Sequence, residues 1–137
     1  MSLAPLFISH GAPDVLINGS PSHHALRTLQ LAPETRAAVI ISAHWEADPL
    51  RVAAAPAPKT IHDFGGFAPE LYEAGYPSPG SPELAGALIE RLREAGLPAT
   101  ADVERGLDHG AWIPMALIRP EADIPVIQIS PARMRAR

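Results

Sequence analysis

Two short apolar runs, each closed by a histidine, constrain the fold of this chain more than any other feature. Residues 5–11 read PLFISHG, and residues 38–45 read AVIISAHW. Both runs are apolar and bounded by turn-forming residues, and the second is rich in β-branched residues, so we predict that each is a buried strand. Ligands of open α/β sheets bind outside the carboxyl ends of the strands. His10 and His44 would lie at two such ends.

These two histidines admit two interpretations. Either each ring only forms hydrogen bonds at the end of its own strand, or the two imidazoles meet on one rim of the sheet. A divalent metal is the commonest reason to bring neutral imidazoles together. The chain has no cysteine, so a metal site would have to use His, Asp or Glu. The placement of His10 and His44 alone leaves both interpretations open.

The other apolar patterns predict strands and helices in alternation. Strands are expected over residues 37–43, 50–54, 98–103 and 124–130, and helices over 22–31, 82–95 and 110–118. The helix over 82–95 is the clearest, because Ser81 can cap it and Gly96 follows it. Residues 55–80 are rich in proline, glycine and aromatic side chains, which indicates a long, ordered loop. The alternation predicts one α/β domain, with a mixed or mostly parallel sheet flanked by helices.

Composition argues against two kinds of partner. The net charge of −4 argues against nucleic-acid binding. No apolar run approaches the length of a membrane span, and residues 1–7 lack the features of a signal peptide. We therefore expect no membrane contact and a cytoplasmic location.

Two further histidines lie in glycine-containing segments. His109 falls in RGLDHGAW, residues 105–112. Either Asp108 or His109 caps the helix that follows, or the helix N-terminus, which favours a neutral ring, projects His109 into a site. His62 falls in TIHDFGGF, residues 60–67. This segment is either an ordered loop with a turn at Asp63 or a lid over an aromatic substrate.

Four motifs stand together in a characteristic order. They are LFISHG at 6–11, ISAHWE at 41–46, IHDFGGF at 61–67 continuing to YPSPG at 76–80, and LDHGAW at 107–112. In this order they resemble the class III extradiol ring-cleavage dioxygenases, in particular the DODA-type 4,5-DOPA dioxygenase branch. The resemblance covers residues 4–130. Residues 1–130 are therefore expected to form the N-terminal part of an extradiol dioxygenase-like catalytic domain, with residues 131–137 as a basic tail outside it.

The resemblance implies a non-haem metal centre that cleaves a catechol ring beside its two hydroxyl groups. It implies Fe(II) for activity, or Zn²⁺ as the bound metal, with a small aromatic diol and O₂ as reactants. By match, His10 and His44 are metal ligands. His109 matches a catalytic histidine that faces substrate or oxygen without binding the metal, and His62 lies on the loop over the site, where a substrate-binding role is expected.

The resemblance also implies a second half of the domain, which supplies a further metal ligand and an acid/base histidine. Neither residue can be placed in this sequence, so the sheet is expected to be truncated and ring cleavage by this chain impaired. The alternative is a noncatalytic remnant that binds metal or a partner subunit. A different metallohydrolase-like α/β protein is a third reading. We expect either a homo-oligomer or a partner chain that supplies the missing half.

Overall fold

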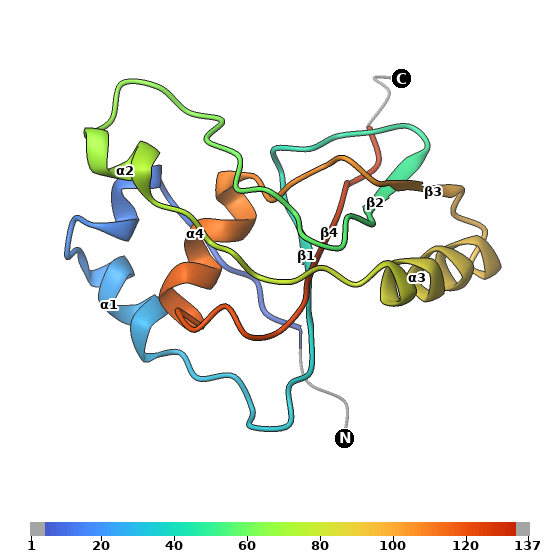
Figure 1. The fold of residues 1–137 in the computed structure, drawn as a ribbon, viewed down its shortest axis with the longest axis horizontal. Helices are drawn as coiled ribbons and strands as arrows, with labels where there is room; N and C mark the ends of the chain where they lie inside the picture. The colour runs from blue at the N-terminus through green and yellow to red at the C-terminus, as the bar shows by residue number, and fades with distance from the viewer. Residues whose placement is uncertain (1–4, 134–137) are drawn as a thin grey trace.

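The computed structural model describes residues 5–133 and contains a sheet flanked by helices (Figure 1). Along the chain the elements are the 3₁₀ helix η1 (Pro13–Leu16), α1 (Pro21–Thr28), β1 (Ala38–Ile41), β2 (Leu50–Ala53), α2 (Pro69–Glu73), α3 (Pro82–Glu94), β3 (Ala99–Asp102), α4 (His109–Ile118) and β4 (Val126–Ile129). The expected α/β architecture is confirmed. No helix within residues 5–133 has both the length and the apolar character to cross a membrane.

The sheet is mixed, and its four strands follow the order β1-β4-β2-β3. β1 pairs with β4 in parallel, and β2 pairs with β3 in parallel, whereas β2 and β4 run antiparallel. All four residues of β4 are buried, as expected for a strand with neighbours on both sides and cover on both faces. The carboxyl ends of β1 and β4 therefore lie at the same edge of the sheet.

Local capping signals start and stop α3 where the sequence indicated, whereas α1 ends at Thr28 rather than at the predicted residue 31. Ser81 accepts a hydrogen bond from the backbone N–H of Leu84 at the start of α3. After α3, Gly96 takes the left-handed conformation at φ +80°, which glycine adopts without a steric cost. At α4, Asp108 rather than His109 is the cap, because its carboxylate accepts the backbone N–H of Gly110. His109 is thereby free to serve another purpose at the first position of α4.

The core has two parts, one on each face of the sheet. Trp112 and other residues of α4 pack on one face together with Val126, and α3 packs on the other face with Ile127. Neighbouring residues of β4 thus point to opposite faces of the sheet, because side chains alternate along a strand. Figure 1 shows α4 and α3 on the two sides of the strands. α4 is apolar around its whole circumference because it lies within the first of these clusters.

The first apolar run contradicts our prediction of a buried strand. Residues 5–10 belong to no strand, and the side chains of Leu6 and Phe7 are exposed. Only Ile8 packs against the α4-side cluster. A strand requires a neighbouring backbone for its ladder, and no strand pairs with this run among the described residues.

β1 forms as predicted but is buried on one face only. Ala38 and Ile40 pack towards α4, whereas Val39 and Ile41 are exposed. By register, Val39 lies beside Ile127 on the α3 side of the sheet. Since α3 packs on β2 and β3, it leaves this part of the sheet bare.

The long loop is ordered, as predicted, and contains the short helix α2. Tyr76 in this loop is only 2% exposed, and its hydroxyl donates to the carbonyl of Arg119. Residue 60 of the loop forms a parallel bridge with Leu107, directly before α4. Of the expected basic tail, Ala132 bridges to Ala47, and residues 134–137 lie outside the described part of the chain. The domain boundary at residue 130 stays a prediction.

Candidate metal centre

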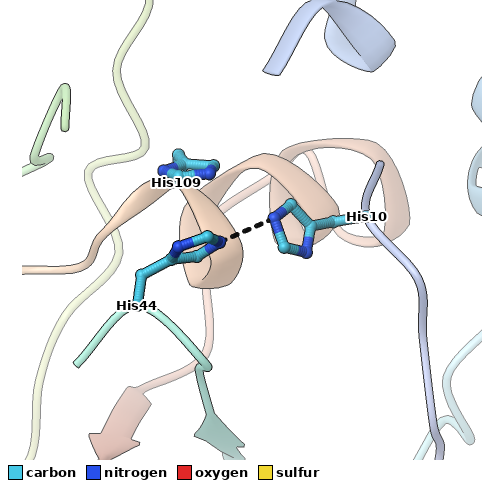
Figure 2. A group of neighbouring side chains, drawn as sticks. All are labelled: His10, His44 and His109. Carbon is cyan, nitrogen blue, oxygen red and sulfur yellow. Dashed lines mark hydrogen bonds between the residues drawn. The ribbon is translucent and has the colours of Figure 1, made fainter. Parts of the chain in front are cut away.

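Three histidines from distant parts of the sequence gather at one place (Figure 2). His10, His44 and His109 each offer one ligand nitrogen, and these nitrogens all lie within 4.8 Å of one another. The Nε2 atoms of His10 and His44 are 3.0 Å apart. The expected convergence of His10 and His44 is confirmed, although His10 approaches from an irregular segment rather than from the end of a strand.

His44 is held in place through the turn that follows β1. The Ser42 hydroxyl accepts the backbone N–H of His44 at 3.3 Å and donates to Oδ1 of Asp108 at 2.7 Å. Gly110 permits this approach, because a Cβ there would lie 2.5 Å from Ser42 Oγ and 2.8 Å from His44 Cδ2. The N-terminal end of α4 and the turn after β1 are thus packed too tightly for any larger residue at position 110.

Asp108 lies beside this turn, and its side chain is fully buried and hydrogen-bonded to several groups. Besides Ser42 and Gly110, its carboxylate accepts hydrogen bonds from Gln128 and from Arg105, the latter at 3.1 Å. The side chain of Gln128 in turn accepts the Asp108 backbone N–H. A buried carboxylate is tolerated only when its oxygens are satisfied, and here the satisfying groups tie β1, β4 and α4 together.

His109 is held by Asp63 of the long loop. Oδ1 of Asp63 lies 2.8 Å from Nδ1 of His109 and accepts the backbone N–H of the same residue at 3.0 Å. Burial of Asp63 opposes its ionisation, but the hydrogen bonds from His109 outweigh it and hold the pKa of this carboxyl below its usual range. The sequence alone predicts only a turn at Asp63, and its position directly after His62 is the one local signal for a role in the site.

Burial and the neighbouring histidines favour the neutral form of the His10 ring. The pKa of His10 lies below its ordinary value, first because the ring is partly buried and then because His109 and His44 stand beside it. A neutral imidazole keeps the nitrogen lone pair that a metal requires. His44 is exposed, whereas His109 is buried, so the group lies at the surface with its His44 side facing solvent.

The donor set fits a divalent transition metal. Imidazole nitrogens suit Zn, Fe, Cu and Ni. Two nitrogens bound tetrahedrally at about 2.0–2.1 Å from a zinc ion are about 3.3 Å apart. The observed 3.0 Å between the His10 and His44 nitrogens therefore needs only a small opening of the pair.

His62 lies outside this group. Its Nε2 contacts the carbonyl oxygen of Ala74 at 2.7 Å, and its ring packs edge-on against Trp112. The loop reaches the histidines through the neighbours of His62 instead: Asp63 bonds to His109, and the ring of Phe64 lies 5.8 Å from the His109 ring. The segment is ordered, but Asp63 lies in no turn and the bend falls at residues 66–67. The lid and the substrate-binding role of His62 stay predictions.

Comparison with known proteins places this chain in a family. The family model described as the catalytic LigB subunit of aromatic ring-opening dioxygenase matches residues 6–135. The chain is 45% identical over 129 residues to the 4,5-DOPA dioxygenase extradiol of Beta vulgaris, covering 90% of this chain and 48% of that protein. It is 42% identical over 127 residues to the 4,5-DOPA dioxygenase extradiol of Escherichia coli K12, covering 91% of this chain and 46% of that protein.

A solved structure agrees with these matches. The crystal structure of an uncharacterised protein from Escherichia coli K12 superposes with a TM-score of 0.52 at 39% identity, covering 72% of this chain and 34% of that one. The chain spans about half the length of the curated relatives it matches. Given a family match over nearly its whole length, the chain belongs to the LigB family of aromatic ring-opening dioxygenases.

Proposed function

We propose that this chain carries the metal-binding part of a centre for extradiol-type cleavage of a catechol ring, with a DOPA-like diol and O₂ as reactants. The observation that carries the proposal is the group formed by His10, His44 and His109 in a chain of the LigB family. Two relatives are named 4,5-DOPA dioxygenase extradiol, which supports the choice of substrate class.

In this proposal His10 and His44 hold a divalent metal, Fe(II) for activity or Zn²⁺ as the bound ion. Their adjacent Nε2 atoms and the lowered pKa of His10 support the assignment. When bound there, Fe(II) would supply the redox chemistry that a catechol and O₂ require, and His10 and His44 would hold it. Holding both reactants at one centre replaces an encounter in solution by a positioned one.

His109 is the proposed catalytic residue on the reactant side of the metal. It is buried, it stands at the first position of α4, and its Nδ1 faces Oδ1 of Asp63. Its remaining nitrogen can accept a hydrogen bond or a proton from a catechol, which must lose a proton to react. We place His62 on the substrate side through the loop that it anchors, next to Phe64.

The second half of the domain is part of the proposal, because the relatives are about twice as long as this chain. We propose that a polypeptide equivalent to that half supplies the further ligand and base and covers the bare face of β1 formed by Val39 and Ile41. Loss of a positioned base costs catalysis about 10²–10⁴-fold. The chain alone is therefore proposed to bind metal and to turn over slowly. The cytoplasmic location expected from the sequence stays a prediction.

The test is anaerobic loading of the purified chain with Fe(II), followed by addition of O₂ and L-DOPA or protocatechuate. We expect stoichiometric metal and weak formation of the yellow ring-opened product. Metal binding with no product at all would favour the noncatalytic alternative. Failure to bind metal would contradict the proposal itself.

A further inference from the structure

We propose that Asp63 is a positioning residue for His109: it fixes the orientation of the ring and places the proton on Nδ1, so that Nε2 is left unprotonated for the site. The inference rests on the proposed function for its catalytic meaning. Its structural content, the choice of tautomer, stands on the contacts of the chain itself.

Two contacts from one oxygen hold His109. Oδ1 of Asp63 lies 2.8 Å from His109 Nδ1 and 3.0 Å from the backbone nitrogen of the same residue. The backbone contact sets where the residue begins α4, and the side-chain contact sets the rotation of the ring. An imidazole bonded at one nitrogen and packed beside His10 and His44 has little freedom to turn.

The chemistry of the pair selects the tautomer. An ionised carboxylate only accepts hydrogen bonds, so the ring nitrogen facing it must carry the proton. In a neutral ring the other nitrogen, Nε2, then holds the lone pair. This is the arrangement in which carboxylates orient histidines around metal centres, where the partner of the ring fixes both tautomer and direction.

The loop that presents Asp63 is itself anchored to the base of α4. The backbone of Ile61 donates to the carbonyl of Leu107 at 2.8 Å, and Leu107 donates back to Lys59 at 2.8 Å. The indole N–H of Trp112 donates to the Ile61 carbonyl at 2.9 Å. Gly106 allows this contact, because a Cβ there would lie 2.1 Å from the Lys59 carbonyl oxygen. Asp63 therefore reaches His109 from a segment that is hydrogen-bonded to the start of α4.

In a purely structural role, Asp63 would only attach the loop to α4 without affecting the proton of the His109 ring. The two roles differ in one measurable quantity, the ring nitrogen that carries the proton. If Asp63 only attaches the loop, its replacement leaves that proton where it was. The protonation of each ring nitrogen is read from two-bond ¹H–¹⁵N correlations of histidine side chains. The chain has six histidines, and the His109 signals are identified by their absence in His109→Asn.

The experiment uses the metal-free chain, labelled with ¹⁵N-histidine, at about pH 9, well above the ordinary imidazole pKa of about 6.5. In the wild type we expect His109 to carry its proton on Nδ1. Asp63→Leu, which has no acceptor, should shift the ring to the Nε2–H form or to a mixture. Asp63→Asn, which retains an acceptor oxygen, should keep the Nδ1–H form. The matched control is Asp123→Asn, which removes an exposed carboxylate paired with Arg119 and should change nothing at His109.

A wild-type ring protonated on Nε2, or on both nitrogens, would overturn the proposal even if Asp63→Leu did not fold. A folded Asp63→Leu variant that still carries the proton on Nδ1 would overturn it as well. None of these outcomes depends on metal or turnover, so failure of this inference and failure of the proposed dioxygenase function are separate results.

Discussion

The Nε2 atoms of His10 and His44 lie 3.0 Å apart although 34 residues separate them in the chain. A hydrogen bond between these two nitrogens requires a proton on one of them and a lone pair on the other. A cation that replaced this proton would bind both lone pairs at once.

Substitution of either histidine should strongly weaken metal binding. His10→Ala and His44→Ala each remove one of the two assigned ligands, so Zn²⁺ affinity should fall by on the order of 100-fold or more, beyond the 10–100-fold typical of residues that merely support ligands. His24→Ala is the control, since His24 lies on α1 and outside the group. Competition against a chromophoric chelator measures all three. A His109→Ala loss equal to that of His44→Ala would show that His109 is a ligand, contrary to its proposed role.

Gly110→Ala should damage the site through packing. The new methyl group would lie 2.5 Å from Ser42 Oγ and 2.8 Å from His44 Cδ2, so the turn after β1 must move. We expect a loss of about 1–3 kcal/mol in unfolding free energy, as for other overpacked sites, together with weaker metal binding. Gly86→Ala in α3 is the matched control: nothing lies within 4 Å of its Cβ position. It should stabilise the chain by about 0.5–1 kcal/mol. Urea denaturation measures both, and equal effects would refute the packing argument.

Loss of the Asp108 carboxylate should destabilise the whole chain. Asp108→Leu leaves Ser42, Gln128 and Arg105 without their shared acceptor. Removing one partner of a buried ionic network costs about 3–5 kcal/mol. Asp123→Asn, at an exposed ion pair with Arg119, should change the urea midpoint little. If Asp108→Leu lowers the unfolding free energy only slightly, the groups around position 108 must form hydrogen bonds with water instead.

Tyr76 should make the fold sensitive to alkali. Burial, and next the carboxylate of Asp123, raise the pKa of the Tyr76 phenol to about 12, against about 10 in an unfolded chain. A raised pKa contributes stability that is fully present below pH of about 10 and is lost as the pH rises through about 12. The chain has two tyrosines, so absorbance titration of Tyr72→Phe reports Tyr76 alone. A titration midpoint at about pH 10 in the folded chain would contradict this prediction. Tyr76→Phe should remove the loss of stability that the Tyr76 phenol causes at high pH.

The bare face of β1 should bind the second half of a relative. Ile41→Glu places a charge on this face, whereas Val103→Glu alters an apolar side chain of equal exposure, 68% in both cases, beyond β3. A tagged second half of the Escherichia coli relative, co-expressed with this chain, should capture the wild type and Val103→Glu but not Ile41→Glu. If the chain alone forms a dimer that Ile41→Glu disrupts, the face is occupied by a second copy instead.

Features set by neighbours in the sequence could be predicted, and the helix ends are the clearest case. Ser81 caps α3 and Gly96 ends it through contacts within one turn, so the residues needed are adjacent in the chain. Strands depend on partners elsewhere. Residues 5–10 have the composition of a strand, yet they pair with no strand in the described part of the chain and leave Phe7 exposed.

The site was predictable in its histidines but not in what holds them. His10 and His44 stand out because each follows an apolar run. Asp63 reaches His109 across 46 residues, and Asp108 reaches Ser42 across 66, and neither distance leaves a periodic signal in the sequence. Only the folded path of the loop and of α4 reveals these two carboxylates.

Because the three histidines come from an N-terminal segment, a turn and a helix start, they are neighbours only while the chain is folded. An ion held by them therefore binds the folded state and not the unfolded one, and so stabilises the fold. With free ion at 100 times its dissociation constant, the folded form would gain about 2.7 kcal/mol over the unfolded one. The thermal midpoint of this small chain should then depend on the concentration of free metal in its surroundings.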